Sequence, residues 1–276
     1  MKNILVPSDF SSEADNALKY ACNLAEIFDT GIDLLHVHDE EIEELTSEAN
    51  AAVTSRTSAV LKETDLQVLV DEFKKRNDKF KAISINTHFS TGNVTDEVVK
   101  ICNATSISII VMGTKGSDST DSAIGSVTSE VIKEAERPVL AVPKQAGYKP
   151  IKKVVYCIDY EGYDKPTINS LASFAGHFDA EIVVVHINSE PQYFDSSRWT
   201  NFQRMVNDAY DYENMRFEFL NHEDILKGID EYIEGKDIDL IAMLTRNYHL
   251  LDRVFPSSMT RSMVLKTKIP LLAFHE

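Results

Sequence analysis

Two glycine-containing segments, Met112–Gly116 and Gly125–Thr128, carry the residue types of a phosphate site. Glycine lets a backbone approach an anion closely, and the free N–H groups at the start of a helix attract phosphate. Lys115 would add a positive charge, and Ser126 and Thr128 would add hydroxyl hydrogen bonds. The segments therefore predict a nucleotide phosphate site, although a turn of this kind that binds nothing is a common alternative.

A second candidate is Asp9, which follows the apolar run Asn3–Pro7. Ligands of open parallel sheets bind beyond the carboxyl ends of the strands. A carboxylate at that edge can accept hydrogen bonds from an amino group or a ribose hydroxyl. The alternative is a purely structural role, in which Asp9 only caps the following helix or hydrogen-bonds within a loop.

Strands and helices alternate in the segments that must position these residues. The fourth expected strand, Ser108–Met112, is almost wholly apolar, as a central parallel strand should be. Five strands alternating with four helices predict a doubly wound parallel sheet with right-handed crossovers. The expected strands are Asn3–Pro7, Ile32–His38, Ala82–His88, Ser108–Met112 and Val139–Val142; the expected helices are Ser11–Phe28, Glu40–Asn77, Val94–Ala104 and Ser126–Glu136.

The second half of the chain repeats the first. At an offset of 150 residues, the run 2–9 lies beside 152–159 and the run 33–37 beside 183–187. Two later pairs, 109–115 with 240–246 and 137–142 with 269–274, follow in the same order. Four ordered matches predict two tandem domains, 1–146 and 147–276, with a polar boundary that contains Gly147 and Pro150. The second helix of repeat 2 is expected at Ser196–Ala209.

These motifs resemble the universal stress protein family over essentially the whole chain, in two copies. The resemblance rests on Val-Pro-x-Asp-Phe-Ser at the start, on Gly-x2-Gly and Gly-Ser, and on the Pro-Val-Leu strand. It implies a Rossmann-like, adenine nucleotide alpha hydrolase-like α/β fold. It also implies that repeat 1 holds ATP or AMP, with or without Mg²⁺. The implied binding residues are Pro7, Ser8, Asp9, Val37, Met112, Gly113, Gly116, Gly125, Ser126, Val127 and Thr128.

Both repeats depart from the family pattern Gly-x2-Gly-x9-Gly-(Ser/Thr). Repeat 1 has eight residues between its second and third glycines, where the family usually has nine. Repeat 2 keeps nine residues and Asp159, but its glycines are replaced by Leu244, Asn247 and Ser257. Because Leu244 would crowd a phosphate, we expect no ordinary ATP site in repeat 2. Gly113→Val is expected to abolish binding in repeat 1 without unfolding the protein.

Other chemically suggestive residues have simpler interpretations. His36 and His186 lie on equivalent apolar strands and are expected to be satisfied core histidines. His38, followed by two acidic residues, is only a weak hint of a metal. Trp199, with the aromatic pair 193–194, is expected to pack, although these side chains could instead line a pocket. No Walker, Gly-x-Ser-x-Gly or metal-ligand spacing is present, so the sequence predicts no catalytic residue.

Composition limits the partners and the compartment. The formal net charge of −16 argues against nucleic acid, which requires clustered lysine and arginine. Three scattered cysteines, with no CxxC pair, suggest a reducing compartment. No run approaches the roughly 20 apolar residues of a membrane span, and the N-terminal residues lack a signal-peptide pattern. We therefore expect a cytoplasmic protein.

The leading functional hypothesis is a stress-response regulator that binds an adenine nucleotide in repeat 1 and acts without turnover. The alternative is a nucleotide-free scaffold that recruits a protein partner, and a weak ATPase is a third interpretation. The resemblance also implies an intrachain pseudo-dimer paired along the last strands, Val139–Val142 and Leu271–Phe274. The sequence leaves open whether two chains form a homodimer.

Overall fold

The computed structural model divides the chain into two compact units, Met1–Lys144 and Gln145–Glu276. The sequence-based boundary, between residues 146 and 147, lies two residues further along the chain. Each unit is described by itself below. The described residues are 2–38, 63–114, 126–158, 165–190, 195–210, 212–245 and 268–275.

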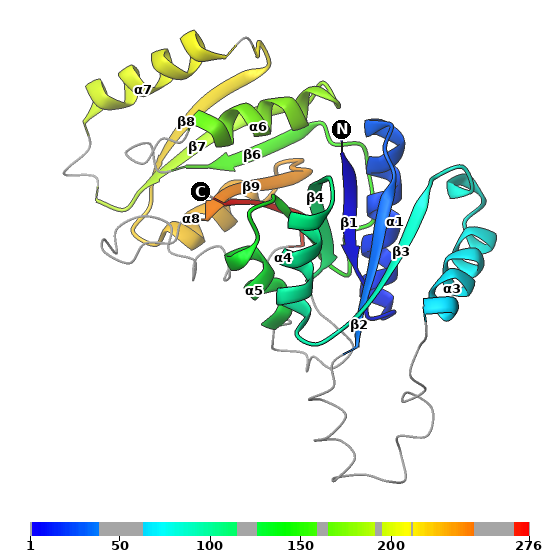
Figure 1. The fold of residues 1–276 in the computed structure, drawn as a ribbon. Helices are drawn as coiled ribbons and strands as arrows, with labels where there is room; N and C mark the ends of the chain where they lie inside the picture. The colour runs from blue at the N-terminus through cyan, green and yellow to red at the C-terminus, as the bar shows by residue number, and fades with distance from the viewer. Residues whose placement is uncertain are drawn as a thin grey trace. The chain divides into compact units, whose positions relative to one another are not determined.

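Unit 1 is an open, fully parallel sheet with helices on both faces, as expected for the predicted fold class. Its strand order is β3-β2-β1-β4-β5. Figure 1 shows α1 and α3 on one face of this sheet and α4 and α5 on the other. The elements are β1 (Asn3–Pro7), α1 (Ser12–Phe28), β2 (Ile32–His38), α3 (Glu63–Arg76), η2 (Asp78–Phe80), β3 (Ile85–Thr91), α4 (Val94–Ala104), β4 (Ile107–Gly113), α5 (Ser126–Glu134) and β5 (Val139–Val142).

The central strands and α1 form the core of unit 1. Ile4, Leu5 and Val6 on β1 are completely buried, because both faces of a parallel sheet are covered by helices. Helix α1 begins at Ser12, one residue after the predicted start, and the Ser11 hydroxyl caps it by accepting a hydrogen bond from the Ala14 N–H at 3.1 Å. The sequence pattern therefore predicts both the central strands and the start of the helix that covers them.

The predicted limits of the third strand were wrong by three residues. The strand was expected at Ala82–His88, but β3 runs from Ile85 to Thr91. Before it, Ile83 is buried outside the strand, and its carbonyl oxygen accepts a hydrogen bond from the Lys74 Nζ at 2.7 Å. Apolar alternation cannot distinguish a buried residue in a turn from one in a strand, so the pattern extended the strand too early.

The second predicted helix, Glu40–Asn77, is described only over its last part. Helix α3 covers 63–76, and residues 39–62 lie outside the described part of the chain. The helix expected at Ser126–Glu136 ends two residues earlier, at Glu134. Arg137 and Pro138 follow, and the residue before a proline is disfavoured in a helix, which accounts for an early end.

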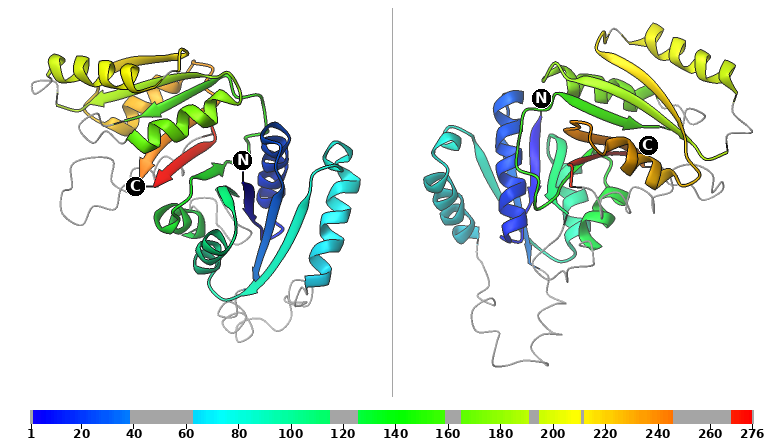
Figure 2. Two further views of the ribbon diagram at one scale, coloured as in Figure 1. Left: turned by 45° about the horizontal axis from the view of Figure 1, so that its top comes forward. Right: turned by 180° about the vertical axis from the view of Figure 1, so that it is seen from behind.

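Unit 2 repeats the topology of unit 1. Its strand order is β8-β7-β6-β9-β10, again fully parallel. Figure 2 shows the two views in which its helices can be followed. Its elements are β6 (Lys153–Cys157), α6 (Lys165–Gly176), β7 (Glu181–Asn188), α7 (Ser196–Ala209), β8 (Met215–Asn221), α8 (Ile225–Ile233), β9 (Leu240–Thr245) and β10 (Leu271–His275).

The internal repeat extends to the strand register. Ile4 pairs with Ile32 in unit 1, and Val154 pairs with Ile182 in unit 2, each 150 residues further on. The helix predicted at Ser196–Ala209 is confirmed as α7. The four sequence matches therefore correspond to equivalent elements of the two units.

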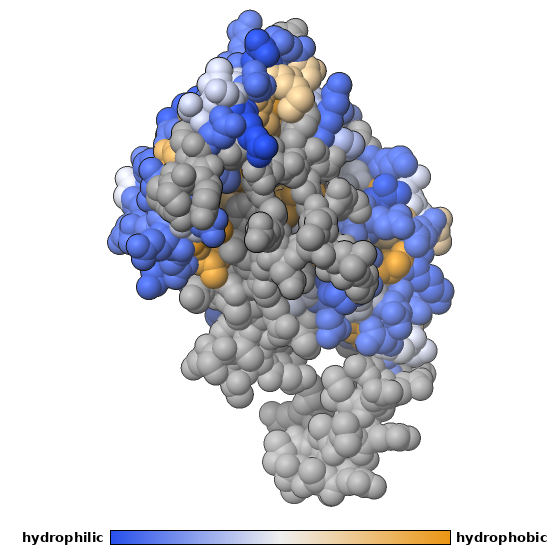
Figure 3. Space-filling view, turned by 90° about the vertical axis from the view of Figure 1, so that its left-hand side faces the viewer, coloured by the Kyte–Doolittle hydropathy of each residue, from blue (hydrophilic) through white to orange (hydrophobic). Residues whose placement is uncertain are grey.

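The described residues on one face of the molecule are mainly polar. Figure 3 shows one face on which hydrophilic residues predominate and apolar residues form only small patches. None of the helices in the described residues is long and apolar enough to span a membrane. All three cysteines, Cys22, Cys102 and Cys157, are buried free thiols, and burial raises their pKa values to about 12, about 11 and about 12.

Candidate functional site

The first part of the candidate site is the loop after β1. Pro7 is the buried last residue of the strand, and Asp9 is exposed at the carboxyl edge of the sheet. The Asp9 Oδ1 accepts a hydrogen bond from the Ser11 N–H at 3.0 Å, and the Ser8 Oγ accepts one from the Phe10 N–H at 3.1 Å. Phe10, which lies between Asp9 and Ser11 in the chain, has a positive φ of 59°. The loop-bonding role considered for Asp9 is therefore present, and its carboxylate also lies at the edge where a ligand would bind.

A histidine holds this loop against β2. The Ser8 carbonyl can only accept, so the His36 Nδ1–H donates to it over 2.8 Å, which defines the neutral tautomer. Burial lowers the pKa of His36, while the bond to Ser8 opposes that shift. Rings of Phe10 and Phe89 lie 4.8 Å and 6.0 Å from the imidazole, measured between centroids. The structure confirms the prediction that His36 is a satisfied, structural histidine.

The second part of the candidate site lies where β4 ends. Met112 is buried, and Gly113 pairs with Val142 of β5. Across the connection, the Thr128 Oγ1 on α5 donates to the Gly113 carbonyl at 2.8 Å. Thr128 is only 3% exposed. Its hydroxyl proton therefore joins α5 to β4 in this structure, which leaves the oxygen lone pairs as its means of contacting a ligand.

Gly113 has a packing role that the sequence analysis missed. A Cβ atom at this position would lie 3.2 Å from the Glu13 carbonyl oxygen and 3.3 Å from the Glu13 Cβ. Such distances are tighter than ordinary side-chain contacts, so glycine permits the first turn of α1 to approach β4. We therefore expect Gly113→Val to strain the packing of α1 on β4 as well, because valine would press on the Glu13 backbone.

An ion pair lies beside the contact between Gly113 of β4 and the first turn of α1. Lys144 Nζ is 2.7 Å from the Glu13 Oε1, and the Ser12 hydroxyl donates to the Glu13 Oε2 at 2.6 Å. The hydrogen bonds from Lys144 and Ser12 lower the pKa of Glu13. Lys144, which the sequence analysis did not name, follows β5 and lies at the carboxyl edge of the sheet.

The remaining predicted residues are only partly described. Val37 on β2 and Val127 on α5 are half-buried, and Ser126 is the first residue of α5, although its side chain is not described. Gly116, Gly125 and Lys115 lie outside the described residues. The Asp39 and Glu40 neighbours of His38 also lie outside them. The described members come from four elements that meet at one edge of the sheet.

The strand order explains why this edge can hold a ligand. From β1 the chain moves through β2 to β3 on one side, whereas β4 and β5 lie on the other side. The adjacent strands β1 and β4 therefore form the switch point where the connections diverge, the usual ligand position in open α/β sheets. Asp9 follows β1, and Gly113 ends β4.

Comparison with known proteins identifies the family. A family model described as the universal stress protein family matches residues 1–143. The chain belongs to this family. The sequence resemblance drawn from the Val-Pro-x-Asp and glycine motifs is thereby confirmed.

Relatives within the universal stress protein family match one or both units. A universal stress protein of Methanocaldococcus jannaschii is 32% identical over 145 residues, which cover 52% of this chain and 82% of the relative. A universal stress protein of Synechocystis is 24% identical over 298 residues, covering 99% of this chain and all of the relative. The crystal structure of a universal stress protein from Archaeoglobus fulgidus has a TM-score of 0.73 at 16% identity, covers 99% and 98% of the two chains, and shows the same fold.

The second unit keeps the histidine but lacks the glycine. His186 Nδ1 lies 3.0 Å from the Ile158 carbonyl, as His36 does with Ser8. Leu244, half-buried, pairs with Phe274 where Gly113 pairs with Val142. Asp159, Asn247, Ser257 and Ser258 lie outside the described residues. The described part of the equivalent edge therefore differs from unit 1 by the leucine predicted to crowd a phosphate.

Proposed function

We propose that unit 1 of this universal stress protein binds an adenine nucleotide, ATP or AMP, and that the protein regulates a stress response by binding rather than by turnover. The observation that carries the proposal is the convergence of Asp9 and Gly113 on the switch point between β1 and β4. Val37 and Met112 supply apolar surface on the neighbouring strands for a base.

The phosphates are assigned to the connection between β4 and α5. Gly113 opens this connection, and α5, which spans Ser126–Glu134, closes it. Free backbone N–H groups at the start of a helix favour an anion, which is how an acidic chain can bind a nucleotide locally. We also assign Gly116 and Gly125 to this phosphate site, together with any Mg²⁺ that accompanies the nucleotide. Three buried free thiols suit a cytoplasmic location for this activity.

A nucleotide-free scaffold remains the second candidate, because the glycine has another explanation. The approach of Gly113 to Glu13 accounts for the missing side chain without a phosphate, and Lys144 already pairs with Glu13. In this alternative, the predicted pairing along Val139–Val142 and Leu271–Phe274 would build the surface that recruits a protein partner.

The deciding experiment is calorimetric titration of the nucleotide-stripped full chain with Mg-ATP and, separately, with AMP. One site per chain is expected, from unit 1. Asp9→Asn retains an oxygen that can accept the Ser11 N–H but removes the charge, so affinity should fall about tenfold. Asp159→Asn is the matched control in unit 2 and should bind like the wild type.

The outcomes separate the two candidates. An absence of binding to both nucleotides would favour the scaffold and overturn the nucleotide proposal. Two sites per chain, or equal losses in Asp9→Asn and Asp159→Asn, would overturn the restriction to unit 1. Slow release of phosphate from bound ATP in the wild type would instead indicate the weak ATPase.

A further inference from the structure

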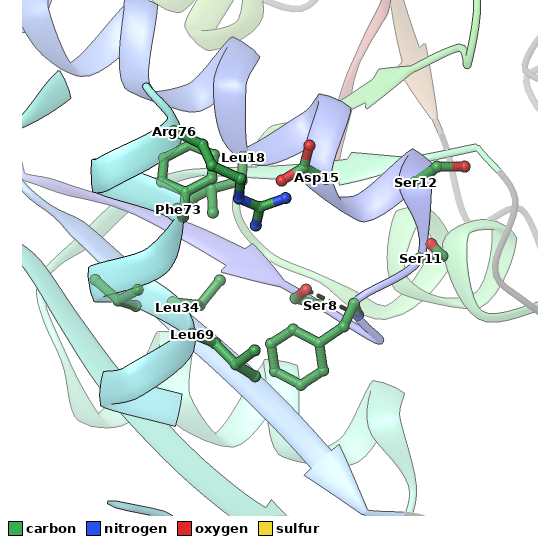
Figure 4. A pocket seen from close by; sticks show the side chains of 11 residues that line it. Ser8, Ser11, Ser12, Asp15, Leu18, Leu34, Leu69, Phe73 and Arg76 are labelled. Carbon is green, nitrogen blue, oxygen red and sulfur yellow. Dashed lines mark hydrogen bonds between the residues drawn. The ribbon is translucent and has the colours of Figure 1, made fainter. Parts of the chain in front are cut away.

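A cavity of about 320 Å³ lies between α1 and α3 in unit 1 (Figure 4). Its apolar walls include Leu18 of α1, Leu34 of β2, and Leu69 and Phe73 of α3. Side chains alternate along β2, so Leu34 and Val37 point to opposite faces of the sheet. The cavity therefore lies on the other face from the apolar surface assigned to the nucleotide base.

The mouth of the cavity carries one acidic and one basic side chain. The Asp15 Oδ2 already pairs with the Lys19 Nζ at 2.6 Å. The exposed Arg76 donates its Nε–H to the Glu72 carbonyl at 3.4 Å, and within the described residues its terminal nitrogens make no hydrogen bond. Figure 4 shows the guanidinium extending toward Asp15 along the mouth. A planar guanidinium with two terminal amino groups suits a carboxylate.

The same face is filled in unit 2. Strand pairing places Thr87 opposite Leu34 in unit 1, but Phe217 opposite Val184 in unit 2. Trp199 is only 8% exposed, and its ring centroid lies 6.3 Å from that of Phe217 in an edge-to-face arrangement. This fold can therefore close the space with aromatic side chains, whereas in unit 1 the described residues leave a cavity there.

We propose that the α1–α3 cavity is a second binding site, for a small amphipathic carboxylate whose head group is held by Arg76. The apolar body would replace water against Leu18, Leu34, Leu69 and Phe73. A water molecule takes up about 30 Å³ in the liquid, so the cavity holds roughly ten atoms of that size. A medium-chain fatty acid has this size and this distribution of charge. This site would exist whether or not unit 1 binds a nucleotide.

The test is calorimetric titration of the full chain with decanoate below the concentration at which it forms micelles. One site per chain is expected. Leu69→Trp should abolish binding by filling the cavity, and Arg76→Gln should weaken it about tenfold, because the charged hydrogen bonds are lost. Arg204→Gln, on helix α7 of unit 2, is the matched control and should leave the affinity unchanged.

Head-group controls use 1-decanol and decylamine. Both should bind at least tenfold more weakly than decanoate, and Arg76→Gln should not weaken either. Equal binding of decanoate and decanol would overturn the carboxylate assignment. Undiminished decanoate binding by Leu69→Trp would overturn the location, as would an absence of binding to the wild type. Leu69→Ala, which enlarges the cavity, checks that any loss in Leu69→Trp reflects filling: it should retain binding, and its failure to bind would count against the site.

Discussion

Unit 1 and unit 2 each carry a histidine on the second strand that bonds to the end of the first strand, yet the side chains packed around the two histidines differ. His36 and His186 each bond to the carbonyl of the residue that follows the first strand of the unit. Around His186, Trp199 stacks on Phe202 with centroids 5.5 Å apart, whereas the corresponding helix face in unit 1 borders a cavity. The two units thus share the backbone and the histidine. They differ in the side chains that fill the space between the helices and this face of the sheet.

The opposite edge of the two sheets shows a similar contrast. In unit 1 the Ser108 hydroxyl donates to the Lys2 carbonyl at 2.7 Å. In unit 2 the residue equivalent to Ser108 is Asp239, which directly precedes β9 and accepts backbone N–H bonds from Lys152 and Lys153 at 2.8 Å and 3.0 Å. The start of the equivalent strand is therefore held in two ways. In unit 1 a hydroxyl donates to a backbone carbonyl, and in unit 2 a carboxylate accepts from backbone N–H groups.

The largest expected effect comes from removing the aromatic filling. Trp199→Ala should destabilise unit 2 by about 3–5 kcal/mol, because it opens a void in a packed cluster. Leu69→Ala, which enlarges an existing cavity, should cost unit 1 only about 1 kcal/mol. Urea unfolding measures the loss, and thiol labelling assigns it to a unit: Trp199→Ala should accelerate reaction of Cys157, the buried cysteine of unit 2, and leave Cys22 protected.

Equal costs for the two variants would remove the proposed contrast between a filled and an unfilled face. Faster labelling of both cysteines in Trp199→Ala would show instead that the units unfold together. Phe202→Leu, which shortens a neighbour of Trp199 while keeping an apolar side chain, should fall between these limits and serves as a control on the cluster.

The next effect concerns the residue at the carboxyl edge. Gly113→Val should destabilise unit 1 by about 1–3 kcal/mol, because its Cβ would press on the backbone of Glu13. Leu244→Val, at the equivalent position of unit 2, removes one methylene and should cost about 1 kcal/mol. Thermal unfolding of both variants tests the difference. A Gly113→Val protein as stable as the wild type would show that α1 can move aside without cost.

The smallest effects concern acid stability. Burial would raise the pKa of Asp239, but hydrogen bonds from Lys149 and from the N–H groups of Lys152 and Lys153 outweigh it and lower the pKa. The pKa of Glu13 is also lowered, by Lys144 and Ser12. A lowered pKa stabilises the fold above the unfolded-state value, and that stability is lost as the pH falls through the folded-state value.

Asp239→Asn should therefore cost about 1–2 kcal/mol at pH 7, and Glu13→Gln less than about 1 kcal/mol, because its lysine is solvent-exposed. Both costs should shrink as the pH falls below the ordinary values of 3.8 and 4.5. Urea unfolding at pH 7 and at pH 3 measures the change. A cost that does not vary with pH would show that packing, rather than charge, is responsible.

The sequence predicted features that repeat with a short period or follow a local chemical rule. The limits of β1 and β2, the start of α1 to within one residue and the structural role of His36 belong to this group. Contacts between distant segments were not predictable in this way. The approach of Gly113 to Glu13, and the bonds from Asn3 and His88 to the buried Asp33, join residues on different elements. No local spacing specifies which such side chains meet.

The loop formed by Ser8, Asp9 and Phe10 has one further consequence. Ser8 and Phe10 border the α1–α3 cavity, while Asp9 between them belongs to the proposed nucleotide site. Two ligands that contact one three-residue loop are thermodynamically linked whenever either of them shifts it. If a carboxylate in the cavity changes nucleotide affinity by some factor, the nucleotide must change carboxylate affinity by the same factor. Unit 1 would then report the joint concentration of two metabolites rather than the level of either alone.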